Sequence, residues 1–117
     1  MNFKVEKVGD VVVIGVGLQR ATLNEAEEFK KTLLTHIDAG TTKLVVDLSA
    51  CEFIDSTFLG ALVVTLKKIT QNRGDLKLVG FQPAVQSMFE LTRMYRIFEA
   101  FKTKDDAVNS FQTTGTK

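Results

Sequence analysis

The sequence predicts a single α/β domain with a mixed, mostly parallel sheet of about five strands and with about four helices. Short β-branched runs alternate with segments whose apolar residues recur at helical spacing, a pattern typical of strands joined by helical crossovers. A chain of 117 residues with 44% apolar side chains can form one core of ordinary size. We expect the domain to occupy residues 1–112 and the polar residues 113–117 to form a tail.

The strands are expected at the β-branched runs. Residues 3–8 alternate apolar and polar side chains, and residues 11–16 are almost entirely β-branched, with a turn at Gly9-Asp10 between them. The two segments should therefore pair as a hairpin at one edge of the sheet. Further strands are expected at residues 43–48, 76–80 and 97–101.

The helices are expected at residues 22–38, 56–72 and 83–94, with a small fourth helix after residue 103. Either Thr22 with Glu25 or Asn24 with Glu27 offers a capping box for the first helix. Gly74 should end the second helix. The residues that we expect the third helix to bury are Val85, Met88, Phe89 and Leu91.

The composition argues against several classes of partner. Fifteen lysines and arginines balance fourteen aspartates and glutamates without a basic stripe, so direct nucleic-acid binding is not expected. The longest uncharged apolar runs, Val11–Leu18 and Phe58–Leu66, are too short to span a bilayer, and the N-terminus does not resemble a signal peptide. The single cysteine, Cys51, cannot form an internal disulfide and suits a reducing compartment. We therefore expect a cytoplasmic protein that has no membrane partner.

A functional loop is expected where the central strand ends. In open α/β sheets, ligands and partners gather at the carboxyl ends of the parallel strands, which here points to residues 49–55. Asp55, Ser56 and Thr57 then place three oxygen-bearing side chains at a helix start. These residues alone fit a simple helix cap as well as a contact surface. Phe58 favours a contact surface, because we expect it to lie beside the buried stripe and partly in solvent.

Two adjoining segments resemble the signature of STAS domains, specifically those of bacterial anti-sigma-factor antagonists. They are Val45-Val46-Asp47-Leu48-Ser49 and Ile54-Asp55-Ser56-Thr57-Phe58-Leu59-Gly60. The resemblance covers nearly the whole chain, including residues 17–22 and 91–98. It implies a STAS-like single domain over residues 1–112 that acts by protein–protein contact, without catalytic residues, metal or cofactor.

The resemblance also implies a partner and a switch. Family members bind an anti-sigma factor, often itself a serine kinase, and so release a sigma factor. Phosphorylation of the serine after the signature aspartate, here Ser56, dissociates the complex, and a phosphatase restores the protein; Thr57 is a candidate second acceptor. We expect a monomer or weak dimer. The residues that we expect to bind the partner are Asp55, Ser56, Thr57, Phe58, Gly60, Gln19 and Arg20.

Two residues differ from the family pattern. Gln19 stands where an acidic residue is common, in the loop expected to face Ser56, and Phe58 replaces a small glycine. The first difference should affect kinase recognition, and the second should narrow the choice of partner. Two alternatives stay open: a STAS protein that binds without being phosphorylated, and a docking subunit of another assembly, such as a lipid-transport ATPase complex or a stressosome-like particle.

Enzyme functions are not expected from the residues. The only histidine, His36, lies about 14 residues into the first helix, which places it roughly 20 Å from Ser56 and too far away to act as its base. A phospho-aspartate receiver would need further carboxylates beside Asp47 to hold Mg²⁺, and the first two strands end without them. The sequence also has no Walker motif, complete dinucleotide fingerprint or cluster of metal ligands.

Overall fold

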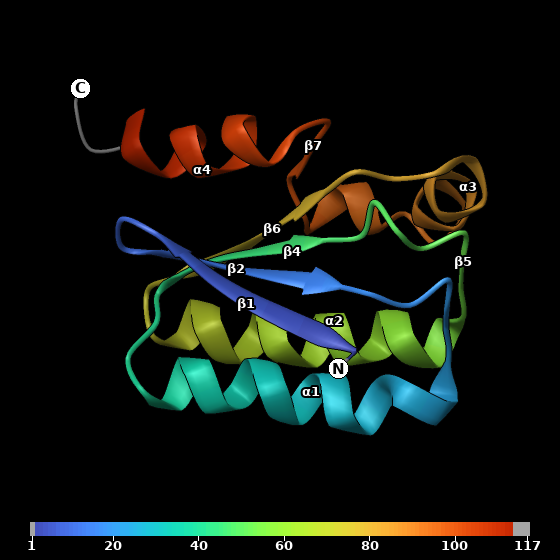
Figure 1. Cartoon of the computed structure of the whole chain (residues 1–117), viewed down its shortest axis with the longest axis horizontal. Coiled ribbons are helices and arrows are strands. Elements are labelled where there is room, and N and C mark those ends of the chain that lie inside the picture. The colour runs from blue at the N-terminus through green and yellow to red at the C-terminus, as the bar shows by residue number, and fades with distance from the viewer. Residues whose placement is uncertain (1, 114–117) are drawn as a thin grey trace.

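Five strands form one sheet in the computed structural model, which describes residues 2–113. Their order is β1-β2-β4-β6-β7, with β1 antiparallel to β2 and every other neighbouring pair parallel (Figure 1). The strands are β1 (Phe3–Val8), β2 (Val11–Val16), β4 (Lys43–Asp47), β6 (Asp75–Val79) and β7 (Ala100–Phe101). The predicted edge hairpin and mixed, mostly parallel sheet are confirmed.

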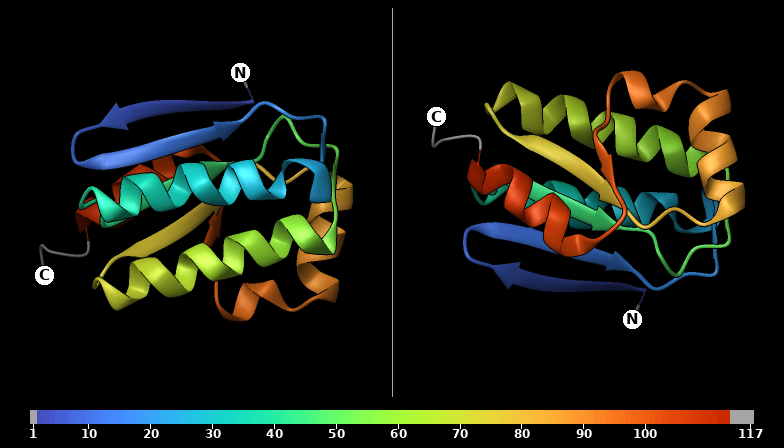
Figure 2. Two further views of the ribbon diagram at one scale, coloured as in Figure 1. Left: turned by 90° about the horizontal axis from the view of Figure 1, so that it is seen from below. Right: turned by 90° about the horizontal axis from the view of Figure 1, so that it is seen from above.

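The four helices cover both faces of the sheet and one of its ends (Figures 1 and 2). The two longest lie side by side on one face, and the last helix covers the opposite face. The third helix lies at the end of the sheet where the parallel strands finish. The helices are α1 (Leu23–Asp38), α2 (Ser56–Gln71), α3 (Pro83–Leu91) and α4 (Lys104–Thr113).

The covering of both faces explains why β2 is apolar throughout. Val12 and Ile14 belong to the larger core beneath α1 and α2, whereas Val11 and Val13 pack in a smaller core beneath α4. Side chains alternate between the faces of a strand, so a strand that is covered twice needs apolar residues at every position.

Local interactions set where the first two helices begin and end. Thr22 caps α1, and its backbone N–H donates to Glu25 Oε1 at 3.0 Å, which selects the first of the two predicted capping boxes. Beyond α2, the left-handed residue is Arg73 at φ 64°, not Gly74. Gly74 is needed for a different reason, because a Cβ there would lie 2.4 Å from the carbonyl oxygen of Thr42.

Several predictions for the last third of the chain were wrong in detail. Helix α3 ends at Leu91, which is 82% exposed and not buried, and a left-handed Arg93 then leads into a short 3₁₀ helix at Met94–Arg96. The last strand contains only the final two of the five predicted residues. Helix α4 extends to Thr113, one residue into the predicted tail, and residues 114–117 of that tail lie outside the described part of the chain.

Candidate partner-binding site

Two loops meet beyond the carboxyl ends of β2 and β4. They contain the two-residue strands β3 (Arg20–Ala21) and β5 (Phe53–Ile54), which pair in parallel as a second small sheet. The Glu52 N–H donates to the Gln19 carbonyl oxygen at 2.7 Å. The loop that enters α1 is thereby fastened to the loop that enters α2. These strands were not predicted, because two residues are too few to show a period.

Arg20 belongs to β3 of this small sheet, and Gln19 immediately precedes it. The Gln19 side-chain amide donates to Glu52 Oε2 at 2.9 Å, and the Arg20 guanidinium lies 4.4 Å from the centre of the Phe53 ring. Both residues therefore hold the loop that leads to Ser56, and both are exposed at its surface.

Asp55 connects the starts of α1 and α2. Its Oδ1 accepts from the Phe58 N–H at 2.9 Å and so caps α2, while its Oδ2 accepts from the Leu23 N–H, the first residue of α1, also at 2.9 Å. One carboxylate thus satisfies free donors of two helices. The sequence predicted the cap but not the second bond, which depends on the helices lying side by side.

Ser56 is exposed at the first position of α2, and Thr57 and Gly60 are exposed on the same helix. The Ser56 hydroxyl forms no hydrogen bond with any residue between 2 and 113. Modification of this hydroxyl would therefore break no interaction within the described chain. The start of α2 is instead capped by Asp55, the residue before Ser56.

Phe58 does not lie at the surface, which corrects its assignment as a partner-contact residue. Its side chain is 0% exposed and stacks on Phe29 of α1, with ring centres 4.4 Å apart and planes inclined by 19°. Phe29 in turn contacts Phe3 of β1 at 5.3 Å. The buried side of α2 is wider than predicted because the helix packs on α1 as well as on the sheet. The row Phe58, Ala61, Leu62 and Thr65, at helical spacing, was the signal for this second contact.

A shallow groove of about 340 Å³ separates α1 from α2 next to Thr57. It was not predicted from the sequence, since it arises only where two helices pack. A Cβ added at Gly60 would meet no atom within 4 Å, so this stretch of α2 is open to a neighbouring molecule. The residues that line the groove are Ala26, Glu27, Lys30, Thr57, Gly60, Ala61 and Val64.

A comparison of the chain with models of known protein families agrees with this fold. The model of the STAS domain family fits residues 2–107. The chain belongs to the STAS domain family.

Relatives of this STAS domain agree in sequence and in fold. It is 35% identical over 81 residues to an anti-sigma-B factor antagonist of Staphylococcus aureus, an alignment that covers 69% of this chain and 72% of that protein. An anti-sigma factor antagonist from Mycobacterium paratuberculosis is 28% identical, with a TM-score of 0.84 over 92% of this chain and 91% of the other. The anti-sigma factor antagonist SpoIIAA in its unphosphorylated form shares the fold, with a TM-score of 0.82, 19% identity and coverage of 95% and 96%. This family membership identifies a non-catalytic regulatory domain.

Other chemically active side chains of the STAS domain lie away from Ser56 or are inert. Burial raises the pKa of the Cys51 thiol to about 11, with a further contribution from the negative charge of Asp47, so the thiol stays protonated near neutral pH. His36 lies in the last turn of α1, whereas Ser56 lies in the first turn of the adjacent α2. Residues 2–113 contain no group of three or more side chains that could hold a metal ion. No helix in that range is long and apolar enough to cross a membrane.

Proposed function

We propose that this STAS domain is an anti-sigma factor antagonist that binds an anti-sigma factor around Ser56 and is released when Ser56 is phosphorylated. The observation that carries the proposal is the difference between two neighbouring residues. Asp55 accepts hydrogen bonds from the starts of two helices, whereas the exposed Ser56 hydroxyl forms no hydrogen bond within residues 2–113. A group can therefore be added at the surface without loss of a structural bond. The relative from Staphylococcus aureus supports the choice of partner by its name, anti-sigma-B factor antagonist.

The position of Ser56 makes a phosphate compatible with the fold. A phosphate brings about −1.5 to −2 charges, and a helix N-terminus favours negative charge by roughly 0.3–1 kcal/mol. Asp55 is a negative neighbour, but each of its oxygens already accepts from a backbone donor. At the level of the fold, the Bacillus cell fate determinant SpoIIAA has been solved in a phosphorylated form with the same architecture, at a TM-score of 0.72.

The partner would instead lose affinity. An anti-sigma factor seated on Ser56, Thr57 and the open surface at Gly60 would have to desolvate the new charge or accommodate its bulk. A penalty of about 3 kcal/mol is sufficient for a loss of more than a hundredfold in affinity. Thr57, exposed at the next position, is the second candidate acceptor.

The cycle needs two enzymes. We propose a serine kinase, which can be the anti-sigma factor itself, and a phosphatase that restores the hydroxyl, both acting in the cytoplasm where sigma factors meet RNA polymerase. Gln19 and Arg20 lie on the loop joined to the one before Ser56, so their side chains are available to a docked kinase.

The test compares tagged wild type, Ser56→Ala and Ser56→Asp as baits in extracts of the source cell, with mass spectrometry of bound proteins and of the peptide that contains Ser56. Wild type and Ser56→Ala should recover the same kinase-like anti-sigma factor, and Ser56→Asp should lose it. Ser87→Asp is the matched control, because Ser87 is an exposed serine on α3. Equal recovery by wild type and Ser56→Asp, with no phosphate on Ser56 after incubation with ATP, would refute the proposal.

A further inference from the structure

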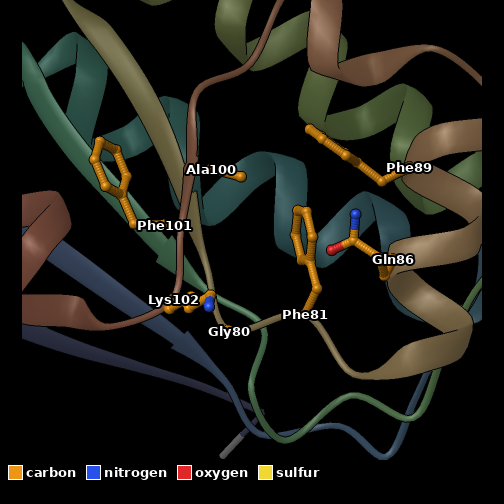
Figure 3. A pocket seen from close by; sticks show the side chains of 7 residues that line it. All are labelled: Gly80, Phe81, Gln86, Phe89, Ala100, Phe101 and Lys102. Atoms are coloured by element: carbon orange, nitrogen blue, oxygen red, sulfur yellow. The ribbon is translucent and has the colours of Figure 1, made fainter.

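A second site candidate lies between α3 and β7, apart from Ser56. A hollow of about 540 Å³ opens there, beyond the carboxyl end of β6 (Figure 3). Its volume falls in the range of about 300–1,000 Å³ that is usual for small-molecule sites. The residues that line it are Gly80, Phe81, Gln86, Phe89, Ala100, Phe101 and Lys102.

The apolar wall of the hollow is aromatic. The rings of Phe81 and Phe89 lie 4.6 Å apart at an angle of 52°, and Tyr95 supports Phe89 from 6.5 Å. The small side chain of Ala100 faces Phe81 across the hollow, while Phe101 points away and packs against the core beneath α4 (Figure 3). The half-buried Phe81 leaves part of its ring available for stacking with a planar ligand.

The base of the hollow is held by a tight approach of three segments. Gly80 adopts φ 81°, and a Cβ there would lie 2.8 Å from the Cβ of Ser49. The Gly80 N–H donates to the Phe101 carbonyl oxygen at 3.1 Å, and the Gln82 side chain donates to the Ser49 carbonyl oxygen at 2.7 Å. These contacts fix the turn after β6 against both neighbouring segments.

Two polar side chains complete the lining. The Gln86 amide nitrogen donates to Glu90 Oε2 at 2.8 Å, which turns the Gln86 carbonyl oxygen toward Phe81 and the hollow (Figure 3). Lys102 is the only charged residue of the lining, and it forms no ion pair with any residue between 2 and 113. The hollow therefore combines an aromatic surface, one hydrogen-bond acceptor and one free positive charge.

We propose that this hollow binds a small aromatic carboxylate. The ring stacks on Phe81, a ring N–H or O–H donates to the Gln86 carbonyl oxygen, and the carboxylate meets the Lys102 ammonium group. A ligand with several phosphates is disfavoured because the lining offers a single cation. The site does not depend on the function proposed for Ser56.

The probe is indole-3-acetate, which has a planar ring, one N–H and one carboxylate. We expect its addition to ¹⁵N-labelled full-length protein to shift the amide NMR signals of Gly80, Phe81, Gln86 and Lys102 in a saturable manner. Indole-3-acetamide, which lacks the charge, should bind about fivefold more weakly. Guanosine triphosphate should not displace the probe.

Substitutions of the lining residues distinguish binding in this hollow from unspecific binding of the probe. Lys102→Met should weaken binding of indole-3-acetate about fivefold and leave that of the uncharged amide unchanged, whereas Lys31→Met, at an exposed lysine of α1, should alter neither. Phe81→Leu should weaken both probes. Absence of saturable shifts at millimolar probe, shifts centred elsewhere, or equal loss of affinity in both lysine variants would overturn the proposal.

Discussion

The two faces of the sheet are stabilised in different ways. Beneath α1 and α2 lies a large, almost entirely apolar core, in which Phe3, Phe29 and Phe58 form a chain of ring contacts. Beneath α4 lies a smaller core that surrounds a charged residue, Lys77, which is only 6% exposed. The face that carries the candidate switch therefore has the larger and more apolar core.

Lys77 shows how the smaller core accommodates a charge. Its ammonium group donates to Ser110 Oγ at 2.6 Å, pairs with Glu99 at 3.2 Å and lies 4.4 Å from the centre of the Phe111 ring. The hydrocarbon stem fills space between β6 and α4, while the charged end reaches the partly exposed Glu99. This face therefore includes one amphipathic side chain beside its apolar residues.

The largest expected effect comes from breaking the aromatic contact on the α1/α2 face. Phe58→Ala should lower the free energy of unfolding by about 3–5 kcal/mol, because it removes a fully buried ring and leaves a cavity beside Phe29. Urea denaturation followed by circular dichroism measures the loss. Val64→Ala on the exposed side of α2 is the control and should change stability by less than about 0.5 kcal/mol. A loss below about 1 kcal/mol for Phe58→Ala would mean that the ring is not packed as described. If the alanine variant does not fold, the free energy of unfolding is measured for Phe58→Leu.

The next effect concerns the carboxylate that joins α1 to α2. Asp55→Ala should cost about 2 kcal/mol, since one helix cap and one further backbone bond are lost together. Amide hydrogen exchange should show faster exchange at both Leu23 and Phe58. Asp38→Ala, at the far end of α1, should be neutral or slightly stabilising because it removes an acidic group from a helix C-terminus. Protection that is lost at Phe58 alone would argue against the bridge.

Cys51, which lies in the larger core, makes the stability of that face depend on alkaline pH. The pKa of Cys51 is raised from 9.0 to about 11 by burial and by Asp47, so folding favours the protonated thiol. The resulting stabilisation is complete below about pH 9 and is lost as the pH rises toward 11, a drop of at most about 2 kcal/mol. Denaturation at several pH values should show this drop in wild type and a smaller one in Cys51→Ala. An equal drop in both proteins would exclude Cys51 as its source.

The smallest effect is expected on the α4 face. Lys77→Met keeps the volume of the stem, and the partly exposed Glu99 can be solvated, so the free energy of unfolding should change by no more than about 1 kcal/mol in either direction. Thermal unfolding by calorimetry is sufficient to detect this. Lys77→Ala should be clearly more destabilising, because it also removes the stem. If both variants lost the same large amount, the ion pair and not the packing would hold α4.

Prediction from the sequence was most successful where the determinants are local. The sequence offered two capping boxes for α1, one of which forms at Thr22, and the apolar run of β2 appears as predicted. Prediction failed at Phe58, whose burial depends on the helix that lies opposite, and at Leu91. Leu91 comes two residues after the buried Phe89, so it lies on nearly the opposite side of α3, which faces solvent.

The sequence by itself determined the α/β architecture, the position of the exposed Ser56 at a helix start and the family, because period, capping and signature residues are read over a few neighbouring positions. Only the tertiary structure decided that Asp55 also binds Leu23, that Phe58 belongs to the core, and that a hollow opens beside Phe81. Each of these depends on the packing of elements distant in the chain, and side-chain burial and cavities arise only from such packing.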